Sequence, residues 1–264
     1  MKKIIFICLI ALTLNACGGS SLLNNQDSGA TGTLSVNVLH HLADGSTLEP
    51  VGGSKTFTNN QGFQITLSEA QIGWRSLQLI SGGTDSSFPE CVAGRDIRVN
   101  LGGADDVLGE DATSLSLVTN QNIQQVSYCR YQIVLGPTAT PAGLVLENSK
   151  SHTTGATASG AATPTTVTYH FQGTWRKGTD SGDINFVRSE PITLLPQPFR
   201  VLEAGHEVSH PLHFHAGSTH EDLSFEIHYD DLFSDINFSA QAATAQNIFD
   251  SNFSESIHQS IVSD

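Results

Sequence analysis

Histidine offers the clearest chemistry in this sequence, and it is concentrated in one segment. Six of the 11 histidines lie between His206 and His228, five of them in HPLHFHAGSTHEDLSFEIHY at residues 210–229. Neutral imidazole is a common ligand of Zn²⁺, Cu²⁺ and Ni²⁺. The segment is therefore a candidate metal site. The alternative is a solvent-facing surface that is rich in polar residues.

The alternation of side chains assigns the first part of this segment to two faces. In a half-buried strand, residues i and i+2 share a face. If Leu212 and Phe214 face the core, then His213 and His215 face outward together.

The second part, LSFEIHY, alternates in the same way. Leu223, Phe225 and Ile227 are expected to face the core, so Glu226 and His228 face outward. The glutamate adds a carboxylate to the imidazoles, a combination that suits Cu²⁺ or Zn²⁺.

A hairpin between these two strands would bring the ligands together. The connecting AGSTHED contains Gly and Ser, and opposite Cβ atoms in a hairpin are about 5 Å apart. A register with His213 near His228, and His215 near Glu226, predicts one divalent-metal site, with Glu226 as the fourth ligand. His40 is a further candidate, but it is in phase with apolar residues of TLSVNVLHH, and an inward histidine is more often a hydrogen-bonded core residue.

The N-terminus predicts export and a lipid anchor. MKKIIFICLIALTLNAC has two lysines, a short apolar run and a small residue before Cys17, as in a signal peptide. Leu14 to Cys17 resembles a bacterial lipobox, so residues 1–16 are expected to be removed and Cys17 acylated. Gly18 matches the sorting pattern of Gram-negative outer-membrane lipoproteins, and residues 17–32 are expected to form a flexible tether. The alternative is an ordinary secretory signal with an incidental cysteine.

Two further cysteines agree with an oxidising compartment. Cys91 and Cys129 remain after processing, and a disulfide is the default pairing outside the cytosol. The alternative is a metal site with two thiolates. If the disulfide forms, the histidines must bind metal without help from thiolates.

The composition restricts the partners. The formal net charge is −14, and such a surface repels nucleic acid and favours cations. We therefore expect no nucleic-acid partner.

The pattern of hydrophobic residues predicts an all-β fold. Short segments of period two alternate with Gly, Pro and Asn, which is typical of an antiparallel β-sandwich. We expect one domain over residues 33–264, with a low-complexity loop at 148–166. Near the C-terminus, apolar residues at helical spacing predict one or two short helices.

Motifs of known enzyme classes are weak or absent. The HFH tripeptide is shared with cupins, but three spacings of the cupin motif fail, so a cupin-like metalloenzyme is the less favoured alternative. No nucleophile elbow, P-loop or dinucleotide fingerprint is present in the sequence. We therefore expect a protein without catalysis of its own.

Three scattered blocks carry a family resemblance. LSVNVLHHLADGSTLEP, FTNNQGFQITLSEAQIGWRSLQLI and HYDDLFSDINF followed by AQNIFDSNFSESI resemble segments of the MbnP-like (methanobactin-associated) periplasmic lipoproteins. The resemblance implies a copper-binding β-sandwich that works with a dihaem peroxidase-like partner. Some relatives coordinate copper with a kynurenine formed from a tryptophan two residues before a histidine. Neither Trp74 nor Trp175 precedes a histidine in this way, so both are expected to serve in packing.

Two hypotheses of different classes follow. The first is a lipid-anchored outer-membrane protein that binds or buffers a transition metal, copper before zinc, and works with a redox partner. The second is a metal-free β-sandwich module that contacts other components of the envelope.

Overall fold

The computed structural model describes residues 31–82, 91, 96–111, 114–124, 126–137, 149–151, 167–203, 206–213 and 220–260. The predicted signal peptide, the predicted lipidation site Cys17, most of the predicted tether and of the low-complexity segment, and His215 lie outside these residues. The first strand begins at Thr31, two residues before the expected start of the domain. Within the described residues, no helix is both long and apolar enough to cross a membrane.

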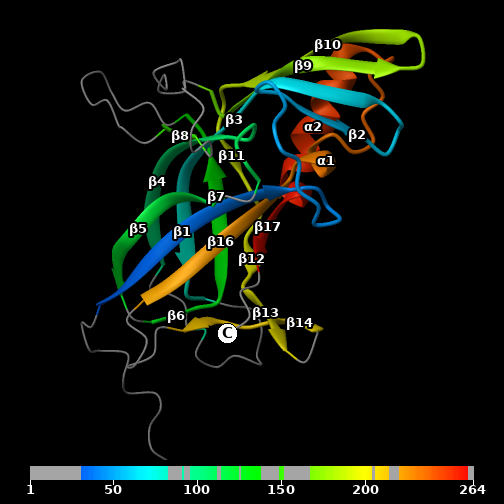
Figure 1. Cartoon of the computed structure of the whole chain (residues 1–264). Helices are drawn as coiled ribbons and strands as arrows, with labels where there is room; N and C mark the ends of the chain where they lie inside the picture. The colour runs from blue at the N-terminus through cyan, green and yellow to red at the C-terminus, as the bar shows by residue number, and fades with distance from the viewer. Residues whose placement is uncertain are drawn as a thin grey trace, which may run out of the picture.

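The all-β fold is confirmed: two main sheets pack face to face, with two short helices near the C-terminus (Figure 1). The smaller sheet has the order β17-β16-β1-β5 and consists of β1 (Thr31–His41), β5 (Leu115–Gln124), β16 (His220–His228) and β17 (Ile257–Ser260). The helices are α1 (Tyr229–Leu232) and α2 (Ala242–Ser256).

The larger sheet is organised around one long strand, β3 (Gln64–Ile80). Its first half lies between β2 and β9, and its second half lies between β4 and β7. The other members are β2 (Lys55–Thr58), β4 (Ile97–Asp106), β7 (Arg130–Leu135), β8 (Ser149–Ser151), β9 (Tyr169–Lys177), β10 (Asp180–Arg188), β11 (Ile192–Thr193) and β12 (Gln197–Pro198). Two small sheets pair β13 (Arg200–Glu203) with β14 (His206–Ser209), and β6 (Ser127–Tyr128) with β15 (Leu212–His213).

The core between the sheets is aromatic and aliphatic. Trp74 of β3 stacks on Phe225 of β16 with ring centroids 6.1 Å apart, which joins the two sheets directly. Both side chains are fully buried, as expected for tryptophan in a packing role. A second aromatic cluster packs α2 against the β9–β10 hairpin. In it, Phe253 stacks on Tyr169 with ring centroids 4.8 Å apart.

Most strand pairs are antiparallel, but β1 and β16 run parallel in register from Thr33↔His220 to His41↔His228. The pair β4–β8 is also parallel. Parallel neighbours need a long connection rather than a tight turn, and here most of the domain separates β1 from β16. The parallel register sets the position of every side chain on the outer face of the smaller sheet.

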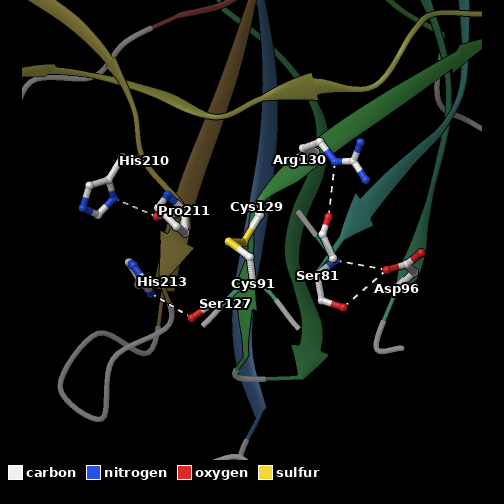
Figure 2. The surroundings of a disulfide bond; sticks show 10 residues. Ser81, Cys91, Asp96, Ser127, Cys129, Arg130, His210, Pro211 and His213 are labelled. Atoms are coloured by element: carbon white, nitrogen blue, oxygen red, sulfur yellow. Dashed lines mark hydrogen bonds between the residues drawn. A yellow bond between two sulfur atoms is a disulfide. The ribbon is translucent and has the colours of Figure 1, made fainter. Parts of the chain in front are cut away.

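The predicted disulfide is confirmed. Cys91 is bonded to Cys129, and their Cα atoms are 5.8 Å apart (Figure 2), within the range of native disulfides. Cys129 lies between β6 and β7, and its N–H donates to the carbonyl of Ile80 at the end of β3. With these thiols oxidised, thiolate coordination of a metal is excluded for the pair.

Candidate metal centre

Three side chains with metal-binding atoms meet on the outer face of the smaller sheet. His41 is the last residue of β1, and Glu226 and His228 lie at the end of β16. The parallel register places His41 beside His228, and Glu226 beside Leu39. Because the side chains of each strand alternate, His41, Glu226 and His228 share one face.

The opposite face of the same strands is buried. Val38, His40, Phe225 and Ile227 point into the core and are at most 1% exposed. The hydrophobic effect therefore fixes the orientation of both strands, and the ligand-bearing residues are held outward by the packing of their neighbours.

The three ligand atoms are close enough for one ion. His41 Nε2 is 3.0 Å from Glu226 Oε2, and His228 Nε2 is 3.9 Å from the same oxygen. One atom from each side chain lies within 4.8 Å of the other two. Metal bonds to nitrogen and oxygen are about 2.0–2.2 Å long, so small side-chain rotations bring all three atoms onto one ion. The side chains are 17 to 26% exposed, which leaves a path for an ion.

The backbone fixes the tautomer of His41. Its Nδ1 donates to the carbonyl of Leu42 at 2.8 Å, because a carbonyl can only accept. Nε2 is thereby directed at Glu226, and a ligating histidine is commonly held by such a bond from its other nitrogen. A divalent ion can bind this nitrogen and the carboxylate oxygen together.

His228 has one buried ring nitrogen that lacks a hydrogen bond. Its Nε2 is inaccessible to solvent and has no hydrogen-bond partner among the described residues, although it faces Glu226. Its Nδ1 lies 3.3 Å from Asp231 Oδ2. The Glu226 carboxylate is the main cause that raises the pKa of His228 above 6.5; burial opposes this rise, and Asp231 adds to it. A buried nitrogen without a partner is costly, and a bound ion would satisfy it.

A second group of three overlaps the first. His228, Asp231 and His258 also bring one ligand atom each within 4.8 Å of the others. Asp231 lies in α1, and His258 of β17 is paired with Glu226 across the antiparallel β16–β17 ladder. The rings of His228 and His258 are 4.7 Å apart. Burial, and then the charge of His228, lower the pKa of His258 below 6.5.

The outward orientation predicted for Glu226 and His228 is confirmed, but the hairpin predicted between residues 212–215 and 223–228 is wrong. β16 lies between β1 and β17, whereas β15 pairs with β6. Alternation determines which face a side chain occupies, but it carries no information about which strand lies alongside.

His213 consequently lies in another environment. Its Nδ1 is 2.9 Å from Ser127 Oγ, and its ring is 5.2 Å from that of His210 (Figure 2). Neither group of three ligands found in the described residues contains His213. His215 lies outside the described residues, so its predicted role as a ligand stays a prediction.

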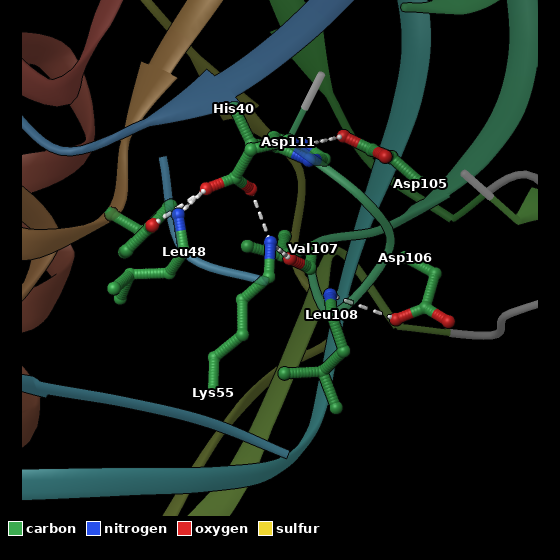
Figure 3. A network of polar contacts seen from close by, with 9 residues as sticks. His40, Leu48, Lys55, Asp105, Asp106, Val107, Leu108 and Asp111 are labelled. Atoms are coloured by element: carbon green, nitrogen blue, oxygen red, sulfur yellow. Dashed lines mark hydrogen bonds and ion pairs between the residues drawn. The ribbon is translucent and has the colours of Figure 1, made fainter. Parts of the chain in front are cut away.

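His40 is a buried core residue, as the usual behaviour of inward histidines indicates. Its Nε2 is 2.8 Å from Asp105 Oδ2 (Figure 3), and the Trp74 indole N–H donates to the same oxygen at 3.3 Å. Within the described part of the chain, no group of three ligand atoms includes His40. The expectation that it ligates a metal therefore finds no set of ligands around it.

Three residues of the centre were missed by the sequence analysis: His41, Asp231 and His258. The alternation in TLSVNVLHH does place His41 on the outward face, so its orientation was available from the pattern. Its neighbours were not, because they follow from the parallel pairing of β1 with β16. Asp231 and His258 have no sequence signal of their own beyond their residue types.

Comparisons of the chain with protein-family models, with curated proteins and with solved structures find no match. Its function is therefore inferred from the side chains of the metal centre and from the sequence.

Proposed function

We propose that this protein is a lipid-anchored component of the Gram-negative envelope that binds or buffers a transition-metal ion, copper before zinc, at His41, Glu226 and His228. The observation that carries the proposal is the convergence of two imidazole nitrogens and one carboxylate oxygen within 4.8 Å on a half-exposed surface. The buried Nε2 of His228, which lacks a hydrogen bond among the described residues, is directed at the same point.

The donor set favours borderline metals. Two nitrogens and one oxygen suit Cu²⁺ and Zn²⁺, and at a given site copper binds more tightly. The resemblance of three sequence blocks to the MbnP-like copper proteins points the same way, and it suggests a dihaem peroxidase-like redox partner. The ligands lie on the outer face of a sheet and leave further coordination positions open to water or to a partner protein, as transfer of an ion requires.

The envelope location rests on the N-terminal sequence. If Cys17 carries the lipid, the variant Cys17→Ser should appear in the soluble periplasmic fraction, whereas the wild type stays with membranes. Unchanged fractionation of this variant would contradict a lipid anchor at Cys17.

One observation favours the alternative of a metal-free interaction module. His41 and Glu226 already form a 3.0 Å pair, so the patch is held together without a metal ion. Under this alternative the patch is a hydrogen-bonded surface. Metal binding would then be weak, and replacing any one of its histidines would have a similar effect on it.

The test is the metal content of untagged protein purified from membranes. We expect copper or zinc in the wild type, and about one ion per chain less in the double variant His41→Ala/Glu226→Gln. His220→Ala is the matched control, because His220 lies on β16 but bonds to Thr33 and Asp222, away from the centre. Metal-free wild-type protein that also fails to take up added Cu²⁺ or Zn²⁺ would support the interaction module instead.

A further inference from the structure

His228 belongs to both groups of three ligands, and its two ring nitrogens face different carboxylates. Nε2 lies 3.9 Å from Glu226, and Nδ1 lies 3.3 Å from Asp231. The lone pairs of one imidazole diverge, so a single ion cannot bind both nitrogens of the same ring. The nitrogen that faces Glu226 and the nitrogen that faces Asp231 can therefore serve two different ions that share the ring.

We propose that the centre is binuclear: a second divalent ion binds to His228, Asp231 and His258, and His228 bridges the two ions as an imidazolate. This inference rests on the proposed function, because it assumes that the first ion binds at His41, Glu226 and His228. It adds a second site, a bridging role for one residue and two further ligands.

The second site is built by the same strand pairing as the first. His258 of β17 lies opposite Glu226 of β16, so β1 and β17 flank β16 and each contributes one histidine. The ring of His228 is 4.6 Å from that of His41 and 4.7 Å from that of His258. Asp231 follows three residues after His228 and closes the site from α1. The three rings thus form a row across the sheet with His228 in the middle.

Both sites have the same donors. Each combines two imidazole nitrogens with one carboxylate oxygen, so each suits the same class of ion, Cu²⁺ or Zn²⁺. Glu226, Asp231 and the imidazolate each bring one negative charge, which offsets most of the charge of two divalent ions. The net charge of −14 on the chain further favours the uptake of cations.

The binding step balances without any redox change. In the metal-free protein, the Nδ1–H of His228 donates a hydrogen bond to the Asp231 carboxylate, which can only accept. The second ion takes the place of this proton, which leaves to solvent, while a new bond joins Nδ1 to the metal. Nε2 holds the first ion throughout, and water fills the remaining positions.

The experiment counts the ions. The full chain, purified in detergent and stripped of metal with a chelator, is titrated with Cu²⁺ and followed by calorimetry and by metal analysis after dialysis. We expect about two equivalents in the wild type and in His220→Ala. We expect about one equivalent in His258→Ala and in Asp231→Asn, with the remaining affinity close to that of the tighter wild-type site. Circular dichroism of each variant establishes that the sheet is intact.

Paramagnetic resonance tests the bridge itself. Two Cu²⁺ ions joined by an imidazolate couple antiferromagnetically, so the signal per copper should fall several-fold when the second equivalent binds. Replacing one copper with Zn²⁺ should restore the full signal of a single copper. Two equivalents whose signals simply add would overturn the bridge.

The outcomes separate this inference from the proposed function. One equivalent in the wild type, unchanged in His258→Ala, would overturn the second site and leave the first standing. No binding at all would overturn both.

Discussion

His40 and His41 are neighbours in β1, yet they have opposite surroundings. His40 is fully buried, and Asp105 and Trp74 complete a polar group inside the core. His41 lies on the outer face, where its Nε2 meets Glu226 beside His228. The same residue type therefore serves packing on one side of the sheet and is available to a ligand on the other.

The inner side contains a second polar group of the same kind. Lys55, 1% exposed, forms an ion pair with Asp111 and donates to the carbonyl of Val107 at 2.9 Å (Figure 3). Tyr229 donates its hydroxyl to Asp111 at 2.8 Å, and the N–H of Leu48 donates to the same carboxylate. Buried charge is tolerated here because each group has several partners. In the outer patch, by contrast, three ligand atoms lie within 4.8 Å of one another on side chains that are 17 to 26% exposed, which makes that patch accessible to a ligand.

The largest expected effect comes from breaking the inner ion pair. Asp111→Ala leaves the Lys55 ammonium buried without its counter-charge, and we expect a loss of about 3–5 kcal/mol in the free energy of unfolding. Urea denaturation measures this loss. Asp180→Ala, on an exposed strand, is the control and should change stability by no more than about 0.5 kcal/mol. Wild-type stability of Asp111→Ala would show that the buried pair contributes nothing.

The two neighbouring histidines offer the sharpest contrast. His40→Ala removes a buried partner of Asp105, and we expect a loss of about 2–3 kcal/mol in stability with metal binding retained. His41→Ala should lose no more than about 1 kcal/mol, because its ion pair is partly exposed, but it should lose the ion that binds at His41, Glu226 and His228. Denaturation and copper titration of both variants check this reversal. Equal metal affinities would remove the distinction between the two faces.

The smallest expected effect is the change with pH in the unfolding free energy of the metal-free protein. The pKa of His228 is raised in the folded state, mainly by Glu226. Its contribution to stability is therefore present below the unfolded pKa of about 6.5 and is lost as pH rises through the folded pKa. The lowered pKa of His258 acts in the opposite direction, because its contribution is lost as pH falls.

The difference between the wild type and Glu226→Gln measures the contribution of the Glu226 carboxylate, which we expect not to exceed about 1 kcal/mol. It is measured as the difference in unfolding free energy between pH 5.5 and 8.5. With Cu²⁺ present, the stability advantage of the wild type should instead grow as pH rises, because imidazole must lose its proton to bind metal. If, in the metal-free protein, the wild type gained stability over Glu226→Gln as pH rises, the role assigned to Glu226 would be contradicted.

Several features were predictable from the sequence because they depend on local patterns. Period two identified the strands and placed Glu226 and His228 outward, and the two cysteines that remain after the predicted processing identified the Cys91–Cys129 disulfide. Helical spacing identified α2, although the chain returns to a strand at Ile257.

The composition of the metal centre depends on contacts that no local pattern encodes. His41 and His228 are far apart in the chain and meet only because β1 and β16 pair in parallel. His213 is close to His228 in sequence but pairs with Ser127 in a different sheet. The density of histidines in the sequence therefore indicated candidate ligands, but it predicted a hairpin that would bring His213 to His228, and the sheet topology does not contain it.

The most direct test of the central claim is a copper titration of the full chain in three forms: wild type, His41→Ala and His220→Ala. We expect His41→Ala to weaken Cu²⁺ binding at the site of His41, Glu226 and His228 by at least about 100-fold, because one of its ligands is lost. We expect His220→Ala to bind Cu²⁺ as the wild type does, because His220 lies beside β1 and has hydrogen-bond partners of its own. Equal affinity of His41→Ala and the wild type would contradict a metal centre at the end of β1 and β16.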